Sequence, residues 1–476
     1  MLRLHDTATG ELAPLRLRAP GEVSMYVCGP TVYDTPHLGH GRAALVFDVL
    51  RRYLIFIGLR VTYVSNITDI EDRIIERAAE RGIDPSELTA TYEAASWQAM
   101  DALGVMRPDE TPHATAYVDR MVELVAELIG RGVAYETGDG VYLSVADVPG
   151  YGLLARQPLE SLRAGARVEP DQEKRSALDF ALWKKAKPGE PTWDSPWGPG
   201  RPGWHTECVV MSLDLLGDGF DLHGGGIDLI FPHHENERAQ AVALGRRFAR
   251  HWVHNGWVTV SGEKMSKSLG NFTSLDDLLS RSDPRAYRLL VLRSHYRSPI
   301  EVTPDTVRDA ESGLARLDEL ARRFALSDLL ADGPIIAPPE GGSDTEFDTG
   351  SDRASDIEPE AITRFRRHMD DDLDTPGALA AVFDLVRRAN GAADAGDSPG
   401  AARLARTAGF VAGALGLSLQ AGSPAAVDSG AAKLIRRRDV ARAAGDWPGA
   451  DALRAELEAA GWLVEDGPDG TRVRQR

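Results

Sequence analysis

Two hydrophobic periods alternate in the first hundred residues. Val23–Val27 and Val61–Ser65 are short apolar and β-branched runs, which is typical of buried strands. Between them, from Gly39 to Phe56, apolar residues recur every three or four positions, as on a helix with one buried face. A strand, a crossover helix and a second strand form the parallel unit of doubly wound sheets, whose ligands bind at the carboxyl ends of the strands. The pattern therefore predicts an α/β domain with its site just after Val27.

The rest of the chain continues this pattern and then becomes helical. Helices are expected over 70–81, 85–103, 117–131, 232–245, 284–294, 304–326, 359–369, 375–393, 399–415, 432–444 and 448–460. Strands are expected at 133–136, 141–145 and 220–223, with a loop over 187–202 and a C-terminal hairpin pairing 462–465 with 471–474. We therefore expect a doubly wound, Rossmann-type α/β domain with an insertion, followed by a helical bundle and a small α+β module.

The composition shifts mark the boundaries of these parts. We expect the first half of the Rossmann-type domain over 1–111, a connective insertion over 112–202, the second half over 203–300, the bundle over 301–420 and the C-terminal module over 425–476. The segment 332–358 is rich in Gly, Pro, Asp and Ser and has too few apolar residues to fold, so we expect a disordered acidic insertion there.

Charge is distributed unevenly along the 476 residues, whose net charge is −18. Ten acidic residues and one basic residue lie between 328 and 360, whereas 431–476 has nine basic and eight acidic residues. Nucleic-acid binding needs a local basic face rather than a basic protein, and Arg436, Arg437, Arg438 and Arg442 provide a candidate. A run of arginines on a helix is also common on a solvated face without any partner.

Membrane and secretory classes are not indicated. No run of about 18 apolar residues could span a bilayer, and the N-terminus lacks the apolar core of a signal peptide. Only Cys28 and Cys208 are cysteines, too few for a disulfide framework. We expect a cytoplasmic monomer that does not bind a membrane.

Two short segments suggest chemistry on a nucleoside triphosphate. In the first, His37, Leu38, Gly39 and His40 stand where a strand-to-helix loop becomes the first turn, and a helix N-terminus attracts phosphate. In the second, Lys264, Met265, Ser266, Lys267 and Ser268 place two lysines three positions apart before a glycine. Paired lysines suit the charge of a departing pyrophosphate. Either segment alone is weak, since a lysine–serine run is usually a solvated loop, but their order and distance make chance unlikely as an explanation.

Together these segments resemble the two ATP-binding motifs of class I aminoacyl-tRNA synthetases. Three further segments, Met25–Asp34, Gly203–Cys208 and His223–Glu237, resemble cysteinyl-tRNA synthetases in particular. The resemblance covers about residues 20–300 and resumes at the C-terminus. It implies that His37, His40, Lys264 and Lys267 are catalytic, that Gly226 and Asp228 cradle the adenosine, and that Mg²⁺ accompanies ATP.

A metal site is the third candidate. On a helix that begins near Pro232, His233 and Glu237 are four positions apart and share one face. With Cys28 and Cys208 they would supply two sulfurs, a nitrogen and an oxygen, which are ligands that zinc accepts. Buried cysteines are often plain core residues, His–Glu pairs often lie on surfaces, and His234 is an alternative ligand to His233. Spacing alone cannot bring Cys28 to Cys208, but the resemblance implies that Cys28, Cys208, His233 and Glu237 hold one zinc ion per chain. It also implies that Thr68 and Trp204 line the substrate pocket.

The C-terminal module carries candidate base contacts. The resemblance implies that the anticodon is held by Arg442, Asp446, Trp447, Asp451 and Asp466. An indole can stack on an unpaired base, arginine can pair with guanine, and carboxylates accept from base amino groups. Without the resemblance, Trp447 before Pro448 would be interpreted as a packing residue at a helix start.

The implied function is ATP-dependent ligation of L-cysteine to tRNA(Cys) through cysteinyl-adenylate, with zinc recognising the cysteine thiolate. Two alternative functions would use part of the same pattern. A cysteine ligase with an amino-sugar acceptor would share the adenylation chemistry but needs no anticodon module. A catalytically silent RNA-binding paralogue would not need the intact histidine, lysine and cysteine positions found here.

Overall fold

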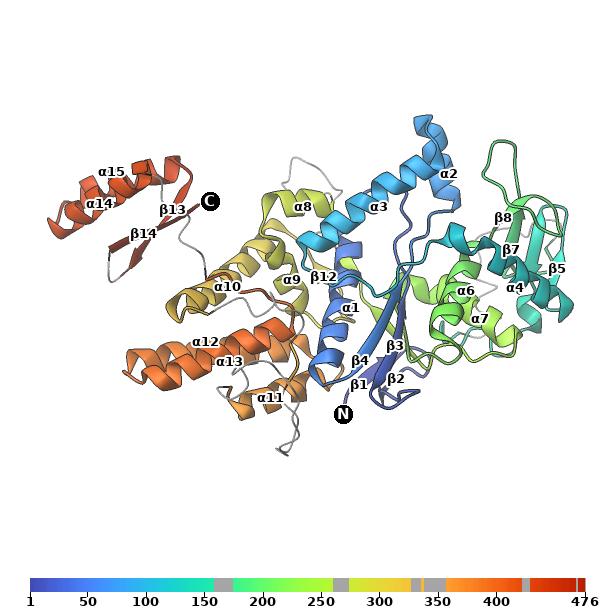
Figure 1. Cartoon of the computed structure of the whole chain (residues 1–476), viewed down its shortest axis with the longest axis horizontal. Coiled ribbons are helices and arrows are strands. Elements are labelled where there is room, and N and C mark those ends of the chain that lie inside the picture. Colours follow the sequence, from blue (N-terminus) through green and yellow to red (C-terminus); the bar gives the residue numbers. More distant parts are fainter. Residues whose placement is uncertain are drawn as a thin grey trace. The chain divides into compact units, whose positions relative to one another are not determined.

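The computed structural model describes residues 1–157, 174–259, 274–326, 335–337, 357–421, 429–467 and 470–475. They form two compact units, one of Met1–Leu317 with Leu329–Leu419, the other of Asp318–Asp328 with Gln420–Arg476. The larger unit contains the sheet, the insertion and the helical bundle, and the smaller one contains the C-terminal helix pair and hairpin (Figure 1).

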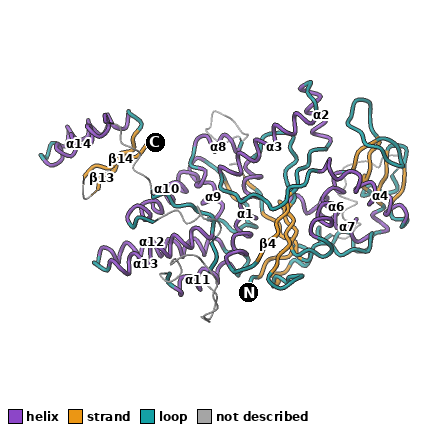
Figure 2. The backbone as a smooth tube through the Cα atoms, in the orientation of Figure 1, coloured by secondary structure: helices purple, strands orange, loops and turns teal. Residues whose placement is uncertain are grey.

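A four-stranded parallel sheet is the centre of the larger unit. Its order is β10 (His251–Asn255), β9 (Leu222–Gly226), β3 (Glu22–Val27) and β4 (Arg60–Ser65). Helix α1 (Leu38–Phe56) crosses between β3 and β4 as predicted. Helices α1 and α6 lie on opposite faces of the sheet (Figures 1 and 2). The doubly wound α/β class is confirmed, and β3 pairs with one strand from each half of the domain, β4 and β9.

Strand β9 continues three residues beyond the predicted 220–223 and begins two residues later. The extension consists of Gly224, Gly225 and Gly226, which have a weak intrinsic preference for strands. Glycine is needed there for packing, because a Cβ on Gly224 would lie 2.3 Å from the Phe47 ring of α1. The same lack of side chains that hides the strand in the sequence lets the helix approach the sheet closely.

The predicted single helix over 232–245 is divided. A π-helical turn at Ile230–His234 precedes α7 (Glu235–Ala243), and Phe231 within that turn has extended backbone angles. Although the helix begins later than expected, His233 and Glu237 still share a face, since His233 Nε2 lies 2.8 Å from Glu237 Oε1.

The insertion contains an antiparallel sheet in the order β5 (Ala134–Glu136), β6 (Gly140–Leu143), β7 (Phe180–Lys185) and β8 (Gly200–Pro202). The prediction of a loop over all of 187–202 is wrong at its end, where β8 pairs with β7. The strand was not predicted because glycine and proline have a low preference for strands. Pro202 is tolerated because β8 is an edge strand, where a residue without an N–H to donate does not interrupt the sheet. A Cβ on Gly200 would lie 2.3 Å from Lys184 O, which explains the glycine.

The remaining helices agree closely with the sequence pattern. They are α2 (Asp72–Arg81), α3 (Pro85–Ala102), α4 (Val118–Gly130), α9 (Pro284–Leu292), α10 (Pro304–Arg323), α11 (Pro359–Met369), α12 (Thr375–Asp394) and α13 (Ser398–Ala414). Elements that the pattern did not predict are β1 (Arg3–Asp6), β2 (Glu11–Pro14), α6 (Trp204–Leu216), α8 (Leu275–Arg281) and the paired strands β11 (Val258–Thr259) and β12 (Ile300–Glu301), besides β7 and β10.

Most of the predicted acidic insertion 332–358 lies outside the described residues. Within its described part Ile335, Ala337 and Ile357 are buried, and Ala337 N donates to Phe56 O at the end of α1 over 2.9 Å. These apolar positions were wrongly included in the segment expected not to fold. The predicted domain boundaries themselves stay predictions.

The smaller unit contains α14 (Ser429–Ala443), α15 (Trp447–Ala459) and the hairpin of β13 (Trp462–Gly467) with β14 (Gly470–Gln475). Ala431, Leu457, Trp462 and Val464 form its small core. The predicted helix pair and hairpin are confirmed.

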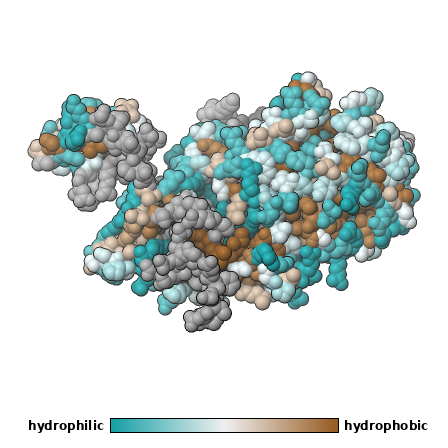
Figure 3. All heavy atoms as spheres, viewed as in Figure 1, coloured by the Kyte–Doolittle hydropathy of each residue, from teal (hydrophilic) through white to brown (hydrophobic). Residues whose placement is uncertain are grey.

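Hydrophilic and hydrophobic residues are interspersed over the face shown in Figure 3. Across the described residues, we find no helix with the length and apolar content that crossing a membrane requires.

Candidate active site and metal cluster

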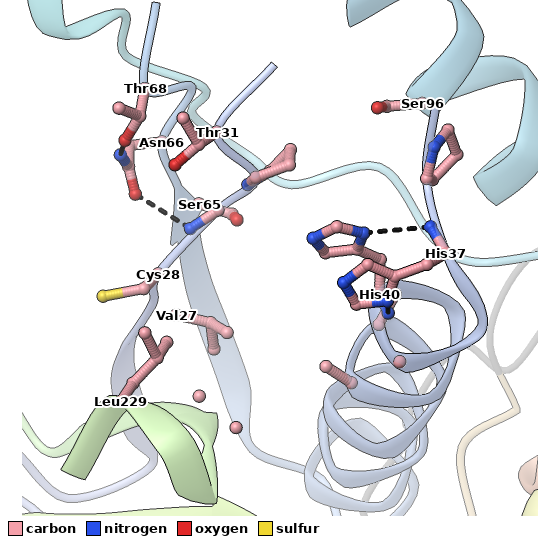
Figure 4. Close-up of a pocket in the computed structure, with 18 of the residues that line it drawn as sticks. Val27, Cys28, Thr31, His37, His40, Ser65, Asn66, Thr68, Ser96 and Leu229 are labelled. Atoms are coloured by element: carbon pink, nitrogen blue, oxygen red, sulfur yellow. Dashed lines mark hydrogen bonds between the residues drawn. The ribbon is translucent and has the colours of Figure 1, made fainter. Parts of the chain in front are cut away.

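A cavity of about 660 Å³ opens at the carboxyl ends of the parallel strands. Its lining comes from the segments after β3, β4 and β9, from the first turn of α1 and from α6. Half of the site residues expected from the sequence line this cavity: Cys28, His37, Leu38, Gly39, His40, Thr68, Trp204, Cys208, Gly226, Asp228 and His233. Figure 4 shows Cys28 on one side of the cavity and His37 and His40 on the other.

The two histidines of the first turn of α1 cap the helix reciprocally. His40 N donates to His37 Nδ1 over 3.3 Å, and His37 N donates to His40 Nδ1 over 3.1 Å. Their rings stack with centroids 3.7 Å apart. A Cβ on Gly39 would lie 2.9 Å from the His37 ring, so glycine is required for this arrangement.

This capping fixes the tautomer of both rings. A backbone N–H can only donate, so each Nδ1 presents a lone pair and the proton of the neutral ring is on Nε2. Burial lowers the pKa of His37, although Asp228 opposes the shift. Burial, aided by His37, lowers the pKa of His40 to about 3. Near neutral pH the pair is therefore uncharged, and each ring has one Nε2–H to donate.

Four potential metal ligands converge from four segments of the chain. Cys28 follows β3, Cys208 lies on α6, His233 lies in the π-helical turn and Glu237 lies on α7. Their donor atoms all lie within 4.8 Å of one another. Cys28 Sγ is 3.7 Å from Cys208 Sγ and 3.4 Å from Glu237 Oε1, while Cys208 Sγ is 3.7 Å from His233 Nε2. Cys28 and Cys208, which are 180 positions apart in the sequence, are thus brought together with the other two predicted ligands.

His205 and Trp204 support His233 from behind. His205 Nδ1 lies 2.9 Å from His233 Nδ1, so the other ring nitrogen of His233 faces the cluster. Gln240 Nε2 donates to His205 O over 2.7 Å, and the Trp204 ring stacks on His233 with centroids 4.1 Å apart. The sequence analysis did not assign a role to His205, although the residue lies within the Gly203–Cys208 segment that carries the resemblance.

His234, the alternative ligand, belongs to a second, overlapping donor group. It consists of Cys28, His223, His234 and Glu237. His234 Nε2 lies 3.2 Å from Cys28 Sγ, and its Nδ1 lies 2.8 Å from His254 Nε2. His223 Nε2 lies 2.6 Å from Glu237 Oε2. Cys28 and Glu237 are therefore shared, and His234 stays a candidate beside His233.

The acidic members of the cluster differ in how readily they ionise. Burial would raise the pKa of Glu237, but His223, His233 and His234 outweigh it and hold that pKa well below its ordinary value. Burial raises the pKa of Cys28 well above its ordinary value, with Cys208 adding to the shift. Burial would also raise the pKa of Cys208, yet hydrogen bonds with Cys28 and His233 help to lower it to about 6. A buried carboxylate and a readily ionised thiol are what a cation would require.

Thr68 has a buried hydrogen-bonding network around it. Thr68 Oγ1 donates to Glu207 Oε1 over 2.6 Å and accepts from Asn66 Nδ2 over 3.2 Å. Asn66 Oδ1 in turn accepts from Gly29 N over 2.9 Å, beside Cys28. Figure 4 shows Asn66 and Thr68 on the Cys28 side of the cavity. Asn66 and Glu207 were not predicted, because nothing in their spacing distinguishes them from other polar residues.

Lys264, Met265, Ser266, Lys267 and Ser268 lie outside the described residues. The structure therefore places only the neighbouring parts of the chain. Trp257 and Val258, the last residues before this interval that line the cavity, lie at its wall.

The anticodon candidates lie on the smaller unit. Asp446 caps α15 by accepting from Gly449 N over 3.0 Å, so it has a local structural role. The Trp447 side chain is 60% exposed, and Asp451 is also exposed. Arg442 is half-buried, and the side chain of Asp466 lies outside the described ones.

One member of the predicted basic face is buried instead. Arg438 is 2% exposed and donates through Nη1 to Thr471 Oγ1 over 2.6 Å, joining α14 to β14. Arg436 and Arg437 are exposed. The basic face is thus smaller than the sequence indicated, because one arginine in three consecutive helix positions turns towards the hairpin.

Three family models match successive parts of the chain. They are described as the tRNA synthetases class I (C) catalytic domain over 15–312, the DALR domain over 364–420 and the cysteinyl-tRNA ligase anticodon binding domain over 425–474. Among solved structures, Mycobacterium tuberculosis methionyl-tRNA synthetase in complex with methionyl-adenylate shares the fold, with a TM-score of 0.58 and 17% identity over 83% of this chain and 89% of that one.

Relatives that match over their full length are named cysteine–tRNA ligase. The cysteine–tRNA ligases of Halorhodospira halophila and Syntrophotalea carbinolica are 46% and 44% identical to this chain, each over 100% of both chains. The match to the anticodon binding domain disfavours the amino-sugar alternative, since a small acceptor needs no such domain. The chain belongs to the cysteine–tRNA ligase family of class I aminoacyl-tRNA synthetases, which charge tRNA(Cys) through an adenylate.

Proposed function

We propose that this chain joins L-cysteine to tRNA(Cys) with ATP, and that one zinc ion held by Cys28, Cys208, His233 and Glu237 recognises the substrate thiolate. The observation that carries the proposal is the cavity itself. Its lining includes Cys28, Cys208 and His233 of the ligand group as well as the two uncharged imidazoles of α1. A cavity of this kind suits a thiol at one end and a phosphate at the other.

The donor group fits zinc. Zn–S bonds of about 2.3 Å and Zn–N or Zn–O bonds of about 2.0–2.1 Å imply tetrahedral edges of roughly 3.3–3.8 Å. Three edges of the donor group lie in this range: 3.7 Å from Cys28 to Cys208, 3.4 Å from Cys28 to Glu237 and 3.7 Å from Cys208 to His233. A fourth, from His233 Nε2 to Glu237 Oε1, is a direct contact of 2.8 Å that a bound ion would widen. The His205 contact also orients His233 in the way that outer-shell partners orient metal-binding histidines.

Cysteine is difficult to select by shape alone. An apolar pocket separates substrates that differ by one small group by only about 1–3 kcal/mol. Bound zinc prefers a thiolate to a hydroxyl and would stabilise the ionised thiol. In this proposal Trp204 and Thr68 line the space beside the thiol. Trp204 also stacks on His233.

Adenylation needs charge stabilisation at the other end of the cavity. The cysteine carboxylate oxygen attacks the α-phosphorus of ATP, and the bond to the pyrophosphate oxygen breaks. The Nε2–H groups of His37 and His40 would donate to the α-phosphate oxygens without first gaining a proton, because both rings are neutral donors. Gly226 and Asp228 would cradle the adenosine, Lys264 and Lys267 would neutralise the pyrophosphate, and Mg²⁺ would accompany ATP.

In the second step, a hydroxyl of the terminal ribose of tRNA attacks the acyl carbon and AMP leaves. For this step we propose that Arg442, Asp446, Trp447, Asp451 and Asp466 hold the anticodon. The 60% exposure of Trp447 supports a stacking role, since a packing residue at a helix start would be buried. The double role of Asp446 as a helix cap means that its substitution would also loosen α15. The monomeric state and cytoplasmic location stay predictions.

Three measurements on the purified chain test the proposal. Metal analysis should find one zinc per chain, and cysteine-dependent exchange of pyrophosphate into ATP should be lost when zinc is removed and return when it is restored. Charging of a tRNA(Cys) transcript should follow with cysteine but not serine. An active enzyme without a transition metal would refute the zinc role, and cysteine transfer to an amino sugar instead of tRNA would refute the acceptor.

A further inference from the structure

Arg42 is an unusual residue of α1, two positions after His40. It is only 1% exposed although it is charged. Its guanidinium donates to three backbone carbonyls: Nη2 to Tyr296 O over 3.0 Å and to Ser298 O, and Nη1 to Trp257 O. Neither motif of the sequence analysis includes this residue.

Burying the charge of Arg42 costs free energy that other contacts must offset. Within the part of the chain that the structure describes, no carboxylate forms an ion pair with its guanidinium. Burial lowers the pKa of Arg42 to about 10, so the group is still charged near neutral pH. A buried charge without a counter-ion is tolerated only where hydrogen bonds compensate for the lost water. The three carbonyls supply that compensation for both Nη groups, whereas Nε has no hydrogen-bond partner among the described residues.

Those carbonyls belong to a junction beside the cavity. Trp257 lines the cavity and directly precedes β11, which pairs with β12 in parallel. Trp257 O also accepts from Ile300 N over 2.9 Å. A Cβ on Gly256 would lie 2.5 Å from Arg297 O, so the two backbones approach as closely as glycine allows. Arg42 thus joins α1 to a tightly packed backbone crossing.

A second set of contacts ties the same turn of α1 to the chain beyond residue 273. Leu275 N donates to Pro36 O over 3.3 Å. Tyr287 Oη donates to Leu38 O over 2.6 Å. The described residues on both sides of the interval 260–273 are therefore bonded to the turn that carries His37 and His40. In the sequence, that interval contains Lys264 and Lys267.

We propose that Arg42 is a positioning residue for adenylate formation, which holds Trp257 and β11 in a fixed relation to the turn that carries His37 and His40. Arg42 does not touch substrate in this role. It fixes the position of Trp257, which lines the cavity, relative to the imidazole pair. The inference rests on the proposed adenylation function.

Arg42→Ala in the full-length, zinc-loaded protein tests the role. A displacement of about 1 Å can cost roughly 10² in rate, so kcat and kcat/KM for pyrophosphate exchange should both fall by about that factor. Cysteine binding, measured separately by calorimetry, should change by less than about threefold, because no metal ligand is touched. Added guanidinium ion should restore part of kcat by refilling the position between the three carbonyls.

Two further variants separate positioning from folding. Arg42→Lys keeps the charge and the stem but cannot reach three carbonyls at once, so it should fold and show a smaller loss of kcat without rescue by guanidinium. Arg288→Ala is the matched control. Arg288 is also 1% exposed and binds the carbonyls of Leu103, Gly104 and Leu415, but none of these residues flanks the interval 260–273. Unlike Arg42 it also pairs with Asp48 over 2.6 Å, so its loss should destabilise the fold more. Arg288→Ala should lower the unfolding temperature with little change in kcat at a temperature where it is folded.

The outcomes are distinct. Loss of exchange by Arg42→Ala with intact cysteine binding and rescue by guanidinium supports the proposal. Wild-type kcat in folded Arg42→Ala or Arg42→Lys overturns it, as does an equal loss of kcat in Arg288→Ala. If the wild-type protein itself shows no cysteine-dependent exchange, the proposed function fails instead, and the two failures are not confused.

Discussion

The metal cluster and the C-terminal helix pair present functional side chains in opposite ways. Cys208, His233 and Glu237 are at most 1% exposed, and each is held by a neighbouring polar side chain. Trp447 is 60% exposed, and Asp451 is exposed too. A buried, fully partnered site is formed before a small ligand arrives, whereas an exposed indole gains its contacts from a large ligand. The difference predicts that substitutions in the cluster act on every step, while those in the helix pair act on tRNA alone.

Cys208→Ser should have the largest effect. It replaces a thiolate ligand by a hydroxyl, which zinc binds poorly. The loss of zinc affinity should exceed the roughly 10–100-fold cost typical of an outer-shell partner. Cysteine affinity should fall with it, and ATP affinity should fall much less. Metal analysis after dialysis and cysteine binding by calorimetry would measure both, and unchanged zinc content would remove Cys208 from the ligand set.

Lys267→Ala should slow adenylate formation by about 10²–10³, the cost of one charge contact made in the transition state. Cysteine binding should hardly change, because the metal cluster is intact. Lys267 lies outside the described residues, so this test probes a role that comes from the sequence alone. Pyrophosphate exchange at the wild-type rate would exclude it.

His205→Ala should weaken zinc binding by roughly 10–100-fold, because it removes the partner that orients His233. A competing chelator titration measures the affinity directly. Gln240→Met removes the donor to His205 O, and it should produce a weaker version of the same effect. Zinc affinity that is unchanged in His205→Ala would mean that the His233 ring is oriented by Trp204 stacking instead.

Trp447→Ala should have the smallest effect and one restricted to tRNA. Loss of stacking on one base costs about 1–3 kcal/mol, which should appear as a raised KM for tRNA(Cys). Cysteine-dependent exchange should be unchanged. Removal of residues from about 425 onward should weaken tRNA charging much further with exchange still intact. If exchange falls as well, the opposition between the buried cluster and the exposed helix pair does not hold.

Local patterns predicted the fold better than the site. The helix and strand periods identified the βαβ unit and all described helices of the bundle, because those elements depend on which face is buried. The spacing of His233 and Glu237 gave two ligands, and the resemblance supplied Cys28 and Cys208. Strands rich in glycine or proline, such as β8 and the end of β9, were missed because their residues serve close backbone approach rather than strand propensity.

The supporting contacts were beyond reach of the sequence for a different reason. His205 meets His233, and Arg42 meets the Trp257 carbonyl, only after distant segments pack together. Every residue has a backbone carbonyl, so the sequence does not show which carbonyls accept hydrogen bonds from a side chain. The partners of Arg42 therefore could not be found by searching for oppositely charged residues. Buried polar residues without an evident partner in the sequence are therefore the positions that most needed the structure.

The contact between Gly224 and Phe47 has a consequence for which substitutions the chain can accept. Phe47 lies seven residues after His40 on α1, about 10 Å along a rigid rod. A methyl group added at residue 224 would have to push that rod away from the sheet, because a Cβ there overlaps the Phe47 ring. The N-terminal end of this helix carries the imidazole pair, so a substitution at residue 224, whose neighbour Gly225 lines the cavity, would tilt the opposite cavity wall. The absence of a side chain at residue 224 therefore sets the distance between α1 and the sheet, and with it the position of His37 and His40.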